Sequence, residues 1–110
     1  MPHKRDDGTT QMSLKLPQEL LDNVEEFAEE RRWSRSQAIN VLLSEGITGP
    51  DHGVELSDKP GLVDNPVSVG TKDEDMVRNI EGLADEEYGE SFNAAARWAL
   101  WNGLAEMTDL

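Results

Sequence analysis

Hydrophobic side chains follow two different periods in the first part of this chain. From residue 11 to residue 16, Met12, Leu14 and Leu16 alternate with polar side chains, and this period of two predicts a short β-strand with one buried face. Pro17 then opens a stretch in which apolar residues recur every three or four positions, which predicts an amphipathic helix ending near Trp33. The apolar face of this helix consists of Leu20, Leu21, Val24, Phe27 and Ala28.

A second helix is predicted directly after the first. Ser34 is a residue type that caps helix N-termini, and Gly46 and Gly49 are expected to end the helix. The apolar stripe of this helix consists of Ala38, Ile39, Leu42, Leu43 and Ile47. Residues 11–48 therefore form one predicted strand followed by two predicted helices.

The same order of elements returns in the second half of the chain. Residues 67–71 alternate as a strand, and Thr71 to Glu74 fits a capping box at the start of the next helix. Residues of the first predicted helix recur 56 positions later and those of the second recur 57 positions later, at Met76, Val77, Ile80, Leu83, Ala84, Ser91, Ala96, Leu100, Gly103 and Leu104. The chain is therefore a degenerate internal repeat. We divide it into a flexible arm at 1–10, a first unit at 11–48, a linker at 49–65 and a degenerate second unit at 66–110.

One strand and two helices do not make a stable domain by themselves. A lone strand leaves its backbone hydrogen bonds unmade, and a unit of this size buries too little apolar surface to fold alone. Each strand must therefore pair with another copy, either inside one chain or like with like across two chains. We favour like with like, because a partner strand with Ser68 and Gly70 on its outer face halves the number of long polar side chains there that can contact a ligand. The expected fold class is mainly α with short β, as two tandem β-α-α units in an intertwined dimer.

An antiparallel pair of these strands places Gln11, Ser13 and Lys15 on the outer face. A two-stranded ribbon fits the major groove of DNA, and Gln and Lys side chains are types that contact base edges there. The helix that begins at Ser34 presents free backbone N–H groups and the positive end of its dipole, which suits a phosphate group.

The segment from Gln11 to Pro17, followed by Leu20-Leu21 and by Ser34 to Ile39, resembles the ribbon-helix-helix family of the Arc, MetJ and CopG repressors. The tandem arrangement resembles that of haloarchaeal regulators. The resemblance implies an obligate dimer that binds double-stranded DNA. It implies base contacts from Gln11, Ser13 and Lys15, and phosphate contacts from Ser34, Arg35 and Ser36, with added charge from Arg31 and Arg32.

The net charge of the chain argues against DNA binding, whereas the distribution of charge along the chain weakens that objection. The 23 acidic and 10 basic side chains give a net charge of −13, which opposes nucleic-acid binding by the whole surface and is typical of proteins in concentrated salt. Resolved by segment, residues 1–48 carry −3 and residues 66–110 carry −7. All six basic residues of 1–48 lie in the arm, the strand or the turn from Arg31 to Arg35. The acidity therefore leaves groove reading by one short ribbon open.

Other chemistry is poorly represented. The chain has no cysteine, no Ser-His-acid arrangement and no phosphate-cradling glycine loop, so we expect neither an enzyme nor a cofactor or metal site. Asp73 to Asp75 is interpreted as a charged helix start, and His3 and His52 as unliganded. No apolar run reaches membrane-spanning length, so we expect a cytoplasmic protein without membrane contact.

The sequence leads to a DNA-binding transcription regulator, a repressor by family resemblance, whose second unit serves dimerisation or partner binding. Trp98 and Trp101 are expected to pack in the core, with partner contact as the alternative. The alternative function is an antitoxin or adaptor whose residues 66–110 bind a protein. A pure interaction module that never binds DNA is the third possibility.

Overall fold

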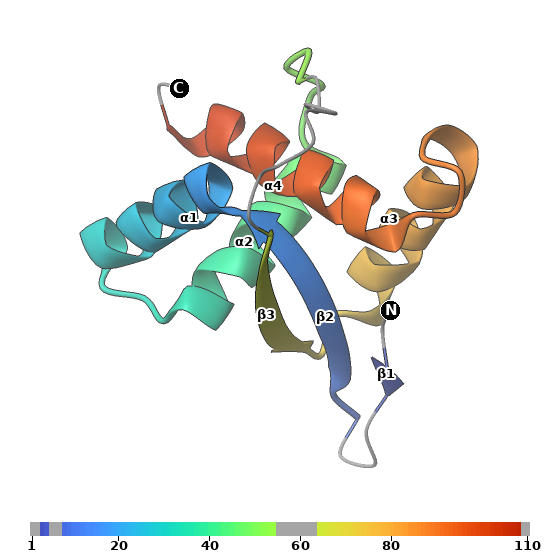
Figure 1. The fold of residues 1–110 in the computed structure, drawn as a ribbon, viewed down its shortest axis with the longest axis horizontal. Helices are drawn as coiled ribbons and strands as arrows, with labels where there is room; N and C mark the ends of the chain where they lie inside the picture. The colour runs from blue at the N-terminus through green and yellow to red at the C-terminus, as the bar shows by residue number, and fades with distance from the viewer. Residues whose placement is uncertain (1–2, 5–7, 55–63, 109–110) are drawn as a thin grey trace.

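The computed structural model describes residues 3–4, 8–54 and 64–108 (Figure 1). The first unit consists of β2 (Thr10–Pro17), α1 (Gln18–Arg31) and α2 (Arg35–Thr48). The second unit repeats this order with β3 (Asp64–Thr71), α3 (Glu74–Glu87) and α4 (Phe92–Met107). The two strand-helix-helix runs predicted from periodicity are thus present, within a mainly helical fold.

Two segments differ in part from the sequence prediction. His3–Lys4, inside the expected flexible arm, forms the short strand β1, whereas residues 1–2 and 5–7 lie outside the described residues. Within the expected linker, residues 55–63 also lie outside the described residues, and Asp64 and Asn65 already belong to β3.

The sheet is built around an antiparallel pair of the two long strands. Ser13 lies opposite Ser68 at the centre, and the pairing runs from Thr10 opposite Thr71 to Pro17 opposite Asp64. β1 pairs antiparallel with the other edge of β2, and the strand order is β1-β2-β3. The two units of one chain therefore complete a single ribbon between them.

This pairing is the opposite of the like-with-like arrangement that we favoured from sequence, and that preference is wrong for this structure. We based that preference on the number of outward side chains that could reach a ligand. Contacts with a ligand contribute nothing to the folding of the free chain. Two strands tethered in one chain have a high effective concentration for each other, so intrachain pairing has a much smaller entropic cost. A separate intertwined dimer is not needed to satisfy β2.

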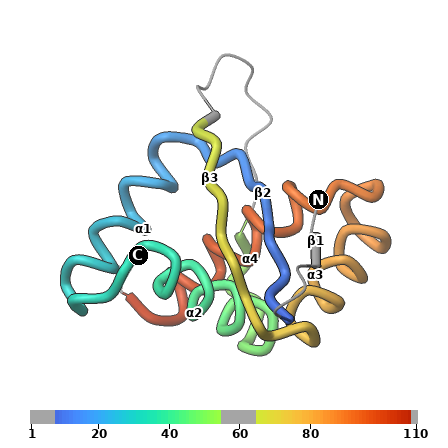
Figure 2. The backbone as a smooth tube through the Cα atoms, turned by 90° about the horizontal axis from the view of Figure 1, so that it is seen from below, coloured from blue at the N-terminus to red at the C-terminus, as the bar shows by residue number. Residues whose placement is uncertain are grey.

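The ribbon covers a core formed by its inner face and all four helices. Met12, Leu14 and Leu16 of β2 and Val67 and Val69 of β3 are buried, as the alternating pattern predicts. Figure 2 shows β2 and β3 crossing the face turned toward the viewer, with the helices around and behind them. The outward face of the ribbon is consequently left uncovered by helices.

Helix ends follow local capping chemistry with two departures from prediction. Ser34 and Ser91 accept hydrogen bonds from the backbone N–H groups of Gln37 and Ala94, at 3.1 Å in both cases. In contrast, α3 is capped by Asp73 and not by Thr71, whose hydroxyl accepts from the Asp73 N–H just before the helix.

The second departure is that α2 runs through Gly46 to Thr48 and ends only at Gly49. Gly46 is needed for a different reason, because α2 and α4 cross closely in the centre of the molecule (Figure 1). Trp98 and Trp101 on α4 are half-buried and pack against the core with one side, so neither is fully enclosed. In the described part of the chain, no helix has the length and apolarity required to cross a membrane.

Candidate nucleic-acid interface

The outward face of the ribbon carries the three residues singled out from sequence. Ser13 and Lys15 are exposed and Gln11 is half-buried. The Gln11 side-chain amide donates a hydrogen bond across the ribbon to the Ser68 hydroxyl. Gln11 is therefore held in a defined orientation, whereas Lys15 projects without such a tie among the contacts of the described residues.

The two ends of this face differ chemically. Lys15 lies opposite Pro66 at one end, and Gln11 lies opposite Gly70 at the other. An exact repeat would place a second long donor at each end, but the second unit supplies proline and glycine there. Among the outward positions 11, 13, 15, 66, 68 and 70, the one charged side chain is Lys15.

Two asparagines that the sequence analysis did not single out fasten the helices to the ribbon. Asn93, in the first turn of α4, accepts from the Lys15 backbone N–H at 2.7 Å and donates to the Lys15 carbonyl at 3.0 Å. Asn40 of α2 donates to the Gly70 carbonyl at 3.1 Å. A signal existed for both, because polar residues beside an apolar helix stripe are suited to the unpaired backbone groups of a strand edge.

These contacts place one helix near each end of the ribbon. The first turn of α4 lies against the Lys15 end and α2 reaches the Gly70 end. In α2, the Ser34 hydroxyl already accepts a backbone hydrogen bond, while Arg35 and Ser36 are exposed in the first turn. The Arg35 guanidinium lies 3.6 Å from the Glu25 carboxylate with both side chains about half exposed, an exposed pairing that contributes little stability.

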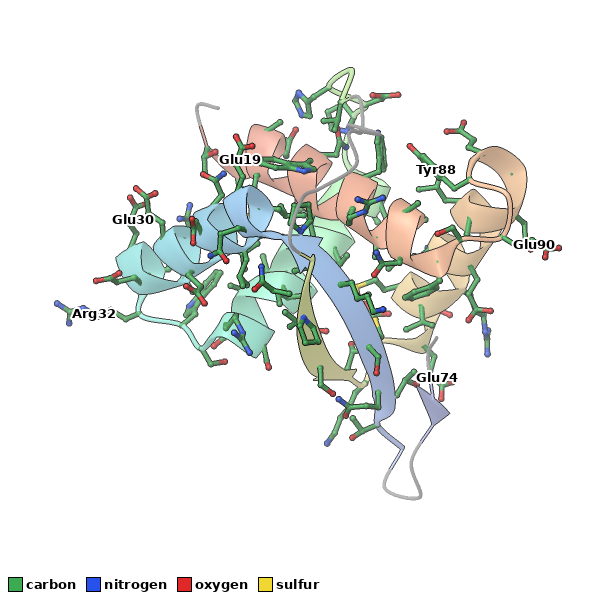
Figure 3. The ribbon with its side chains drawn as sticks, viewed as in Figure 1. Glu19, Glu30, Arg32, Glu74, Tyr88 and Glu90 are labelled. Carbon is green, nitrogen blue, oxygen red and sulfur yellow. The ribbon has the colours of Figure 1, made fainter. Side chains whose placement is uncertain are left out.

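The two arginines at the end of α1 have different surroundings. Arg31 is half-buried, stacks over the Phe27 ring with its guanidinium carbon 3.9 Å from the ring centre, and donates to the Met107 carbonyl at 3.4 Å. Arg31 thus joins α1 to the end of α4. Arg32 adopts the left-handed conformation with φ of 60° at the helix C-terminus, and its side chain extends away from the ribbon (Figure 3).

Two of the carboxylates labelled in Figure 3 lie far from the ribbon. Glu30 and Glu90 lie at the periphery of the helical body and point away from the ribbon (Figure 3). Other carboxylates lie closer, since Glu25 is 3.6 Å from the Arg35 guanidinium and Glu74 lies beside β1 (Figure 3), so the positive charge is confined to the six outward ribbon positions themselves.

Asp73 and His52 both make structural contacts. Asp73 caps α3 by accepting from the Met76 N–H at 3.0 Å, and His52 lies 2.5 Å from the Glu106 carboxylate. No group of three or more potential metal ligands occurs in the part of the chain that the structure describes. The His3 side chain is outside the described set.

Comparison with protein-family models, with curated proteins and with solved structures finds no match.

Proposed function

We propose that this protein is a sequence-specific DNA-binding transcription regulator that inserts the β2–β3 ribbon into the major groove. The observation that carries the proposal is the uncovered outward face with Gln11, Ser13 and Lys15 on one strand of a centrally registered antiparallel pair. Neighbouring strands lie about 4.8 Å apart, so two of them fit a groove about 12 Å wide.

The side chains on this face match the chemistry of base edges. A lysine ammonium donates to the two acceptors of guanine, and a glutamine amide pairs with the donor and acceptor of adenine. The Gln11–Ser68 hydrogen bond orients the Gln11 amide before any DNA is present, which lowers the entropy lost on binding.

The first turn of α2 supplies phosphate chemistry beside the ribbon. Exposed Arg35 and Ser36 stand at a helix N-terminus, where free N–H groups and the helix dipole favour an anion. Arg31 is instead occupied by Phe27 and Met107, and Arg32 extends away from the ribbon, so we assign neither a primary role in phosphate binding.

The second unit has a concrete role in this proposal. It supplies β3 as the partner strand, and it holds the Lys15 end of the ribbon through Asn93. One chain thereby provides the ribbon for which two identical chains would otherwise be required.

Selection from a random library of duplex DNA by the full chain tests the proposal. We expect a preferred sequence to emerge, and Lys15→Ala to weaken binding to it by about 1–3 kcal/mol with relaxed choice at one base pair. Arg78→Ala, which removes the same charge from the exposed side of α3, is the matched control and is expected to leave binding unchanged. Failure to enrich any sequence, or equal affinity of the folded Lys15→Ala variant for the selected site, rejects the proposal.

A further inference from the structure

The internal repeat creates two equivalent grooves of different size. The first lies between α1 and the end of α4 and is lined in part by Glu26, Phe27 and Glu30, with an open volume of about 110 Å³. The second lies between α3 and the end of α2, over Trp98 of α4, with an open volume of about 470 Å³. We call this second one the α3 groove.

Two differences between the repeats remove side-chain bulk from the α3 groove. At an offset of 56, Glu26 and Phe27 of α1 correspond to Gly82 and Leu83 of α3. A Cβ on Gly82 meets nothing within 4 Å. Glycine inside a helix is less favourable than alanine, and no close packing requires it here, in contrast to Gly46.

The α3 groove is wide open to solvent and has an apolar part within a partly polar lining. Ile47, Leu83 and Trp98 line it from three different helices, and each is half-buried. A bulky apolar side chain placed against these three residues displaces water from apolar surface, which lowers the free energy of the complex.

The charge beside the groove determines what kind of partner fits. α3 carries six carboxylates and one arginine, and Glu86 lines the groove itself. Arg78 also lines the groove, and its guanidinium lies 3.8 Å from the Glu74 carboxylate and 3.7 Å from the Asp75 carboxylate, so carboxylates outnumber the single cation there. The flanking potential is therefore negative.

We propose that the α3 groove docks a cationic amphipathic helix of a partner protein, with one bulky apolar side chain seated between Ile47, Leu83 and Trp98. A second copy of this chain is a poor occupant, because its net charge of −13 repels the acidic groove margin. The proposal does not depend on DNA binding, since the groove and the outward ribbon face have no lining residue in common.

A displayed library of random 14-residue peptides, panned against the intact protein in moderate salt, tests this inference. Enriched peptides are expected to combine Lys or Arg with one aromatic or large aliphatic anchor. Their binding is expected to shift the amide resonances of Gly82 and Leu83 and the Trp98 indole resonance.

The Gly82→Gln variant fills the groove without adding charge and is expected to lower affinity for these peptides at least tenfold. Gly82→Ala leaves most of the volume and serves as the matched control. The proposal is overturned by no enrichment, by enrichment of acidic or uncharged peptides, or by equal binding by the folded Gly82→Gln variant. Concentration-dependent shifts at these residues without peptide also overturn it, because they indicate self-association.

Discussion

Gly46 of α2 and Gly103 of α4 occupy equivalent positions where the two central helices cross. A Cβ on Gly46 would lie 1.8 Å from the Ala99 carbonyl oxygen, and a Cβ on Gly103 would lie 2.2 Å from the Leu42 carbonyl oxygen. Ala99 and Leu42 are themselves equivalent at an offset of 57. This reciprocity is the signature of an isologous contact, here made between the two halves of a single chain.

Replacing either crossing glycine is expected to damage the fold. Gly103→Ala forces a methyl group into backbone that has no rotamer with which to move away, so we expect destabilisation of about 3 kcal/mol or more. Urea denaturation followed by circular dichroism measures the effect. Gly82→Ala is the control, and it should be neutral or stabilising by up to about 1 kcal/mol because its Cβ enters open space. Equal stability of the two variants would contradict the close crossing.

The pairing of β2 with β3 within one chain predicts that the protein is a monomer in solution. Light scattering coupled to size exclusion is expected to give a monomer at micromolar concentration, because β2 is already paired with β3. A sample mixed from two differently isotope-labelled chains should show no cross-strand contact between Ser13 of one label and Ser68 of the other. Contacts between Ser13 of one label and Ser13 of the other would instead support the like-with-like dimer, whereas Ser13–Ser68 contacts between labels would indicate units exchanged between chains.

The selected DNA site is expected to lack two-fold symmetry. Lys15 and Pro66 form one end of the ribbon face and Gln11 and Gly70 form the other, so the two halves of a site meet different donors. Stoichiometry by titration should be one chain per site. A palindromic consensus bound by two chains would contradict the single-chain ribbon as the reading unit.

Tyr88 provides a pH-dependent test of the second unit. Burial raises the pKa of Tyr88 above its ordinary value of about 10, with further increases from the negative charges of Glu87 and Asp51. Below pH 10 the phenol is protonated in both folded and unfolded states, so it contributes no pH dependence there. As the pH rises past 10, the unfolded chain ionises first, and stability falls until the folded-state pKa is passed.

The phenolate absorbance reports this titration directly, because Tyr88 is the only tyrosine in the chain. Concentrated salt should remove much of the contribution from Glu87 and Asp51 and leave the larger one from burial. A midpoint at or below the ordinary value in the folded protein would show that the Tyr88 environment differs from the one described.

Local features of this fold were predictable because short-range chemistry decides them. Alternation at Met12, Leu14 and Leu16 requires a strand, and the 3.6-residue spacing in α1 requires a helix, wherever the partner surface comes from. Ser34 caps α2 by accepting a hydrogen bond from Gln37, which is only three residues away in the sequence. The cap of α3 was misassigned because Thr71 and Asp73 are both good caps, and the pairing of Thr71 in β3 leaves Asp73 at the helix start.

The outward residues of the candidate site could be predicted from the sequence, whereas the contacts that hold them in place could not. Gln11, Ser13 and Lys15 lie on the outward face because strand periodicity alone places them there. The Gln11–Ser68 tie and the two hydrogen bonds from Asn93 join residues 57 and 78 positions apart. The periodicity of the sequence cannot predict contacts between residues so far apart along the chain.

The sequence by itself therefore determined the repeat, its strands and helices, and the side of each element that is buried. Only the tertiary structure decided that β2 pairs with β3 of the same chain. It also decided that Arg31 contacts Phe27 and Met107, and that Gly82 leaves the α3 groove open. The physical reason is that the two strands carry nearly the same pattern, so either can pair with either. The choice depends on chain tethering and on how four helices pack beneath the ribbon.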